Sequence, residues 1–320
     1  MKSAVLFLTY RRYSTAAQVF QAIRIAKPER LYFVSNAENP VHSGEHDKIK
    51  KVRALLDQVD WHCEVKTLFR SSHLPVKESI SSAIDWFFSQ ESEGIILEDD
   101  CLPDPTFFQF CETNLVRYRD DNRVAMITGT NFRDDEWLLE TSYTFSRMVI
   151  VWGWATWARA WKHYDVTMDE WPTLKKQKLL EGLFENSMDR DYWGEKFDHT
   201  YLGRINTWDY QWVMAVWKTG GLSCVPTLNL VSNIGFGSDS EHTKDATQWF
   251  ANLPRTAMTV PLRHPKVVEL DRRLDRYFLD KVFETWKIAK KRSRARVLGA
   301  KVLRGLRIAA GFRRRKGKIV

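Results

Sequence analysis

The chain has 320 residues, of which 44% are hydrophobic and 28% charged, and its formal net charge is +9. This length fits one large domain or two small ones, and the composition excludes disorder, collagen and coiled coil as the main architecture. No apolar run is long enough for a membrane span or a signal peptide. The four Cys residues show no CxxC spacing and are expected to be reduced, so we predict a cytoplasmic protein.

The positive charge is concentrated in the last part of the sequence. Residues 281–320 hold 15 Lys or Arg and one acidic residue, whereas the remainder, with 34 basic and 39 acidic residues, carries −5. Apolar residues recur in this tail at helical spacing, namely Leu298, Val302, Leu306 and Ala309. A basic amphipathic helix of this kind binds anionic membrane surfaces, so we predict peripheral membrane association. A solvated tail and a nucleic-acid-binding tail are the alternatives, and the acidic body argues against nucleic acid as a partner.

Strand and helix patterns alternate in chain order through the first part of the sequence. Apolar or alternating runs predict strands at 4–9, 30–35, 62–69 and 94–97, and helical periodicity predicts helices at 14–25, 45–59 and 77–90. Such alternation is typical of an α/β fold with a mostly parallel sheet between helices, in which ligands bind at the carboxyl ends of the strands. Neither GxGxxG after the first strand nor GxxxxGK[ST] occurs, which argues against a dinucleotide-binding Rossmann domain and a P-loop NTPase.

Three adjacent acidic residues, Glu98, Asp99 and Asp100, follow the apolar run 94–97. Three carboxylates at one strand end repel one another and are costly to desolvate unless something positive binds them. Mg²⁺ and Mn²⁺ prefer oxygen ligands and combine one or two carboxylates with phosphate oxygens. The pattern therefore favours a site for a divalent cation with a diphosphate, and an acidic turn in contact with water is the alternative.

The segment from Gly94 to Phe108, GIILEDDCLPDPTFF, resembles the Glu-Asp-Asp segment of GT-A nucleotide-sugar glycosyltransferases. It is similar in particular to N-acetylglucosaminyltransferase of type I and to bacterial surface-polysaccharide glycosyltransferases. The resemblance runs from the first predicted strand to about Lys244. It implies a GT-A, Rossmann-like catalytic domain at 1–280, with a nucleotide-sugar half at 1–130 and an acceptor half at 131–280, followed by the basic tail at 281–320.

The resemblance also implies roles for residues at the strand ends. It assigns Asp100 to a Mn²⁺ or Mg²⁺ ion that bridges the donor phosphates, and it assigns Glu98 and Asp99 to the nucleoside. The loop after the first strand would hold the nucleotide through Tyr10 and Arg12, with Arg12 on a phosphate. These five residues would form the donor site.

Two further positions of the donor site follow from the same resemblance. After the second strand a residue would read the nucleotide base, and either Asn36 or Glu38 stands where the family has an acid or amide. The segment 233–243 is similar to the loop that closes over the donor diphosphate, and it would bring His242 to the metal. A histidine in a polar loop that contacts only solvent is the alternative for His242.

The acceptor side is expected to come from the Trp-rich region, since nine of the 14 Trp lie between residues 152 and 217. The resemblance implies an acceptor loop with Trp152, Gly153 and Trp154, where flat indole faces suit sugar rings. It also implies that Asp209 is the catalytic base that takes the proton of the attacking hydroxyl. The alternative is that Asp209 caps a helix that begins at Tyr210.

These observations predict a metal-dependent glycosyltransferase of polysaccharide synthesis. It would move a sugar, with inversion at the anomeric carbon, from a nucleotide diphosphate donor to a glycan or lipid-linked glycan hydroxyl. A sugar-nucleotide nucleotidyltransferase is the alternative enzyme, but the sequence Tyr10-Arg11-Arg12-Tyr13 lacks the glycines expected of it. A membrane- or glycan-binding protein without turnover is the alternative from another class.

Overall fold

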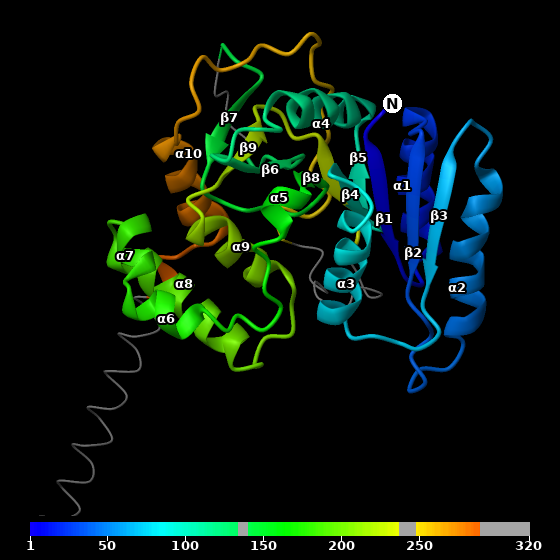
Figure 1. Cartoon of the computed structure of the whole chain (residues 1–320), viewed down its shortest axis with the longest axis horizontal. Coiled ribbons are helices and arrows are strands. Elements are labelled where there is room, and N and C mark those ends of the chain that lie inside the picture. Colours follow the sequence, from blue (N-terminus) through cyan, green and yellow to red (C-terminus); the bar gives the residue numbers. More distant parts are fainter. Residues whose placement is uncertain (134–139, 237–247, 289–320) are drawn as a thin grey trace, which may run out of the picture.

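The computed structural model describes residues 1–133, 140–236 and 248–288, and an eight-stranded sheet forms its centre (Figure 1). The strand order is β3-β2-β1-β4-β8-β6-β9-β7. The strands are β1 (Ala4–Thr9), β2 (Arg30–Ser35), β3 (Glu64–Phe69), β4 (Glu93–Glu98), β6 (Val124–Thr128), β7 (Tyr143–Ser146), β8 (Trp154–Trp157) and β9 (Leu222–Pro226). Only the pairs that involve β7 or β8 are antiparallel, so the other six strands run in one direction.

Helices cover both faces of the sheet. One face packs against α1 (Tyr13–Ala26), α2 (Glu45–Arg53) and α4 (Pro105–Arg117), and the other against α3 (Val76–Phe88) and α9 (Asp209–Lys218). The remaining α-helices are α5 (Ala158–Trp161), α6 (Trp171–Lys176), α7 (Leu179–Leu183), α8 (Ser187–Tyr201) and α10 (Arg272–Tyr277). Among them, α6, α7 and α8 lie together at the side of the molecule away from β3 (Figure 1).

Strand β1 illustrates why the sequence forms this sheet. Its residues from Ala4 to Leu8 are all buried, and their side chains alternate between the two helix layers. Leu6 packs in the cluster with α3, and Phe7 in the cluster with α1. A strand buried on both faces needs a continuous apolar run rather than an alternating one. The carboxyl end of β1, at Thr9, is thereby fixed next to that of β4.

A small second sheet extends the molecule beyond the end of β4. Strand β5 (Cys101–Pro103) pairs with β10 (Val231–Asn233) in antiparallel fashion, with Cys101 opposite Asn233. The N–H of Ile234 then donates to the carbonyl oxygen of Asp100 at 2.8 Å. The chain that leaves β10 is therefore held against the acidic residues at the end of β4.

The predicted α/β fold, a mostly parallel sheet flanked by helices, is confirmed. The strands predicted at 4–9 and 30–35 have these bounds in the structure, and the helix predicted at 45–59 is divided into α2 and a 3₁₀ helix, Ala54–Gln58. The expected acceptor loop around Trp154 differs, because residues 154–157 form strand β8 within the main sheet. No helix in the described ranges has the length and apolar character to span a bilayer. The predicted tail helix, with Leu298, Val302, Leu306 and Ala309, lies outside the described residues, which include only 281–288 of the tail.

Candidate functional site

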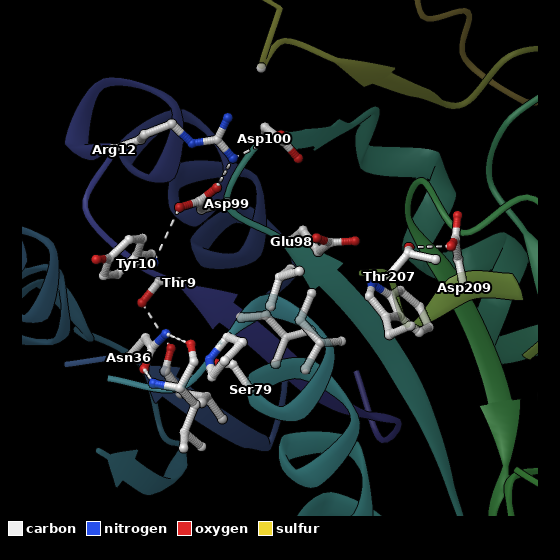
Figure 2. Close-up of a pocket in the computed structure, with 18 of the residues that line it drawn as sticks. Thr9, Tyr10, Arg12, Asn36, Ser79, Glu98, Asp99, Asp100, Thr207 and Asp209 are labelled. Atoms are coloured by element: carbon white, nitrogen blue, oxygen red, sulfur yellow. Dashed lines mark hydrogen bonds and ion pairs between the residues drawn. The ribbon is translucent and has the colours of Figure 1, made fainter. Parts of the chain in front are cut away.

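A cavity of about 980 Å³ opens at the carboxyl ends of β1, β2 and β4, opposite the start of α9 (Figure 2). Its polar lining includes the residues after β1, the three acids at the end of β4 and the segment that leads into α9. This is the edge of a mostly parallel sheet where ligands are expected to bind. Most of the sequence-predicted donor residues therefore face one space with the predicted base Asp209, namely Tyr10, Arg12, Asn36, Glu98, Asp99 and Asp100.

Arg12 joins two of the three acids at the end of β4. Its Nη2 donates to Asp99 Oδ1 at 2.5 Å and to Asp100 Oδ2 at 2.8 Å. The backbone N–H of Tyr10 donates to the other oxygen of Asp99 at 3.2 Å. The loop after β1 is thus fastened to the end of β4 by charge-assisted hydrogen bonds, which are stronger than neutral ones.

The electrostatics of this group follow from its burial. The Asp99 side chain is almost fully enclosed, and burial raises its pKa to about 6, although Arg12 opposes the shift and the charge of Asp100 adds to it. Burial alone would lower the pKa of the Arg12 guanidinium, but the charges of Asp99 and Asp100 raise it above its ordinary value. Arg12 is therefore a permanent cation at this end of the cavity.

Glu98 points away from Arg12, toward Thr207 and Asp209 (Figure 2). In the described part of the chain it forms no ion pair, although it lines the cavity. Burial raises the pKa of Glu98 well above its ordinary value, and the charges of Asp100, Asp99 and Asp209 act in the same direction. The three consecutive acids therefore differ in their partners: Asp99 and Asp100 contact Arg12, and Glu98 faces the other side of the cavity (Figure 2). Alternate residues of an extended chain point to opposite sides.

Asp209 is the first residue of α9 and lies across the cavity from Glu98 (Figure 2). The Thr207 hydroxyl and the backbone N–H of Tyr210, the latter at 2.9 Å, both donate to its Oδ1. The helix begins at Asp209 itself, its cap position is Trp208, and no side chain caps it. The alternative, in which Asp209 caps a helix that begins at Tyr210, is therefore wrong. With one oxygen held by Thr207, the Asp209 carboxylate is oriented, and it pairs with no described cation.

Tyr10 and its neighbour are held by a buried acid that the sequence analysis missed. Glu45, at the start of α2 and 2% exposed, accepts from the Tyr10 hydroxyl at 2.5 Å, from Arg11 and from the N–H of Asn39 at 2.8 Å. Hydrogen bonds from Tyr10 and Asn39 lower the pKa of Glu45 although burial acts to raise it. Tyr10 also lies near His73, with ring centroids 5.6 Å apart. Acids are common in the first turn of a helix, so the sequence carried no signal that singled out Glu45.

The two candidates for the base-reading position lie in different places. Asn36 lines the cavity, but its amide is engaged with the backbone: Nδ2 donates to the Leu74 carbonyl at 2.8 Å, and Oδ1 accepts from the Leu74 N–H at 3.1 Å and from the Ala37 N–H at 2.9 Å. Glu38 is outside the cavity lining, half exposed and 3.8 Å from His46. Asn36 therefore shapes the cavity wall by joining the end of β2 to the loop before α3.

Of the three acceptor candidates, only Trp152 lines the cavity. Trp154 is fully buried in β8 and stacks on Trp208, with ring centroids 5.8 Å apart and the planes at 24°. Gly153 has a φ of +62° and leaves no room for a side chain, since an added Cβ would lie 2.7 Å from Val231. Trp208, which does line the cavity, was not among the expected acceptor residues and is supported from behind by Trp154.

The residues present fit a divalent cation that takes most of its ligands from a substrate. Within the described residues no group of three His, Cys, Asp or Glu side chains converges on one point. Asp100 nevertheless presents a carboxylate at the cavity wall, and hard cations are commonly held by one or two carboxylates together with phosphate oxygens. His242 lies outside the described residues.

Comparison with known proteins adds no family. No family model and no curated protein matches the sequence. Among solved structures, apo UDP-glucose pyrophosphorylase aligns with a TM-score of 0.36 and 7% identity, over 73% of this chain and 93% of its own. The inositol-1-phosphate CTP transferase from T. maritima aligns with a TM-score of 0.36 and 11% identity, over 70% of this chain and 85% of its own. UDP-glucose pyrophosphorylase complexed with UDP-glucose aligns with a TM-score of 0.31 and 10% identity, over 51% of this chain and 79% of its own. At TM-scores below 0.5, these similarities carry no argument about the function of this chain.

Proposed function

We propose that this protein is a metal-dependent glycosyltransferase that moves a sugar from a nucleotide diphosphate donor to a hydroxyl of a glycan acceptor. The observation that carries the proposal is the division of the cavity into two ends. At one end Arg12 and Asp100 offer a cation and a metal-binding carboxylate to a diphosphate. At the other end Asp209 offers an oriented carboxylate that no described cation neutralises.

The reaction that fits these groups is an inverting displacement. Asp209 accepts the proton of the acceptor hydroxyl as its oxygen attacks the anomeric carbon, while Thr207 holds the carboxylate in place. The bond from that carbon to the diphosphate breaks, and Arg12 stabilises the negative charge that develops on the leaving group. A divalent cation on Asp100, when bound, supplies further charge stabilisation of the diphosphate. Trp152 and Trp208 give flat apolar surface for a sugar ring.

The charge of the cavity favours transfer of a glycosyl group over transfer of a nucleotidyl group. A nucleotidyltransferase must hold a triphosphate together with a sugar phosphate, and this needs a strongly cationic cleft. The acidic side chains of the cavity lining, Glu98, Asp99, Asp100 and Asp209, outnumber its two arginines, Arg11 and Arg12. The nucleotidyltransferase remains the second candidate because it would use the same strand ends.

The proposal is tested by measuring two possible products, the nucleoside diphosphate that a glycosyltransferase releases and the pyrophosphate that a nucleotidyltransferase releases. The protein is incubated with UDP-, GDP- and dTDP-sugars, with and without Mn²⁺, and separately with nucleoside triphosphates and sugar 1-phosphates. We expect metal-dependent release of a nucleoside diphosphate from one sugar nucleotide, lost on chelation. Release of pyrophosphate from a triphosphate would establish the nucleotidyltransferase instead. Binding without turnover in either assay would identify a binding protein and overturn the proposal.

We also propose that the tail at 281–320 holds the protein at anionic membranes, near a lipid-linked acceptor. The support is its charge, 15 basic residues against one acid, combined with apolar residues at helical spacing. Deletion of residues 291–320 should release the protein from anionic liposomes and leave turnover of a soluble acceptor unchanged. Liposome binding that persists in the truncated protein would reject this role.

A further inference from the structure

Arg12 occupies one of the two oxygens of Asp100, to which a cation could otherwise bind. Its Nη2 lies 2.8 Å from Asp100 Oδ2, and the same nitrogen bridges to Asp99. Both side chains are largely enclosed, since 22% of Arg12 and 16% of Asp100 are exposed. The one guanidinium is therefore shared between two carboxylates at the wall of the cavity.

The segment after β10 lies against the same oxygen of Asp100, Oδ2. Gly235 approaches so closely that an added Cβ would lie 2.2 Å from Asp100 Oδ2 and 2.7 Å from Arg12 Nη1. The Ile234 N–H holds this segment to the Asp100 backbone. A second cation cannot share the Oδ2 lone pairs with Arg12 in this enclosure, because two positive charges at such separation repel strongly in a partly dry site.

We propose that Arg12 and the divalent cation compete for Asp100, and that the donor diphosphate relieves the competition by drawing Arg12 away from this carboxylate. This inference rests on the proposed function. Without a nucleotide, Arg12 stays on Asp99 and Asp100 and keeps the metal affinity of the site low. When a diphosphate is present, Arg12 gains a partner with more charge and Asp100 becomes free to bind the metal. Metal and donor consequently bind with positive cooperativity, and metal ions alone do not fill the site.

The test measures Mn²⁺ affinity in the absence of nucleotide, by electron paramagnetic resonance of the free ion. The proteins are wild type, Arg12→Gln and, as matched control, Arg11→Gln, which loses the same charge one residue away and whose guanidinium forms an ion pair with Glu45. Couplings between sites typically amount to 5- to 150-fold, and we expect Arg12→Gln to bind Mn²⁺ about 10-fold more tightly than wild type. The control should stay within about 2-fold of wild type, since its charge is not in contact with Asp100.

An Arg12→Gln protein that binds Mn²⁺ no more tightly than wild type overturns the inference, and so does an equal gain in Arg11→Gln. If Arg12→Gln does not fold, Arg12→Lys is measured, because an ammonium group bridges the two carboxylates less well and should give an intermediate affinity. In wild type, the nucleoside diphosphate that stabilises the protein most among UDP, GDP, CDP and dTDP should raise Mn²⁺ affinity, and no rise contradicts the inference. If none of them binds, the proposed function fails, whereas the nucleotide-free affinities still decide the role of Arg12.

Discussion

The carboxylates at the two ends of the cavity have different partners. At the donor end, Asp99 and Asp100 share one guanidinium, and the Tyr10 N–H donates to Asp99 as well. At the acceptor end, Glu98 and Asp209 lie on opposite sides of the cavity (Figure 2), and neither forms an ion pair within the described residues. The first arrangement fastens the loop after β1 to the end of β4. The second costs stability, because two carboxylates repel across a partly buried space.

The carboxylates at the acceptor end, which pair with no described cation, indicate that the catalytic step takes place there. A fold retains repelling carboxylates when their cost is compensated by function, and such groups cluster in active sites. The donor end resembles a binding site prepared for an anion and a metal. The acceptor end resembles a catalytic site, in which the proton-accepting group must not be neutralised. Each of the following substitutions changes one end and leaves the other intact.

The largest effect is expected at the acceptor end. Asp209→Asn keeps the shape of the side chain but cannot accept the proton of the attacking hydroxyl. We expect turnover to fall about 10²- to 10⁴-fold, the usual contribution of a general base, with donor affinity unchanged. Steady-state kinetics together with nucleotide binding checks this. A variant that loses donor affinity and turnover equally would place Asp209 in the donor site instead.

The geometry of the donor end is tested by adding a methyl group next to Asp100 and Arg12, without a change of charge. Gly235→Ala adds a Cβ that would lie 2.2 Å from Asp100 Oδ2, so Arg12 and Asp100 must move. We expect donor affinity to fall roughly 10-fold, which corresponds to the 1–3 kcal/mol that an overpacked site costs. Gly182→Ala in α7 is the control, because its added Cβ would meet nothing within 4 Å. Equal affinities of the two variants would mean that the segment after β10 does not contact the donor site.

The smallest effect concerns stability and its dependence on pH. The pKa of Glu98 is raised in the folded protein, by burial and by neighbouring carboxylates, so its contribution to stability is full at low pH and is lost as pH rises. Glu98→Gln removes this loss. We expect the variant to be more stable than wild type at pH 8 by on the order of 1 kcal/mol, a usual size for a single substitution, and equal to it near pH 4.

Urea unfolding across this pH range measures the difference between Glu98→Gln and wild type. The exposed Glu29, replaced by Gln, serves as the control. A Glu98→Gln variant that parallels wild type at every pH would show that Glu98 is not held in a repelling environment.

Much of the first half could be predicted from the sequence, for a physical reason. Strands β1 and β2 are buried on both faces, so their apolar runs coincide with their bounds. Because parallel strands end at one edge of a sheet, the side chains after them were expected to gather, and Tyr10, Arg12 and Asp99 do. The pairing of Arg12 with Asp100 was not predicted, since the two residues are 88 positions apart and both were assigned to ligands.

The Trp-rich half was harder to predict. Most of its Trp residues pack in the core around α8 and α9, and a buried indole looks the same in sequence as one that lines a cleft. Trp154 was expected in an acceptor loop because of the resemblance to glycosyltransferases, yet it lies in a central strand. Nothing in the sequence indicated that Glu45 supports Tyr10, because that contact depends on how α2 packs beside the end of β1.

The central claim is that Asp100 and a divalent cation hold the donor diphosphate. Thermal unfolding of wild type and Asp100→Ala with UDP-, GDP- and dTDP-sugars, with and without Mn²⁺, tests it most directly, and Asp57→Ala on the surface is the control. Saturation at about 100 times the dissociation constant contributes about 2.7 kcal/mol, so one donor should raise the wild-type Tm by roughly 5–10 °C with Mn²⁺. We predict that Asp100→Ala loses the Mn²⁺-dependent part of this rise while Asp57→Ala keeps it. A metal-dependent rise that survives in Asp100→Ala would contradict the account.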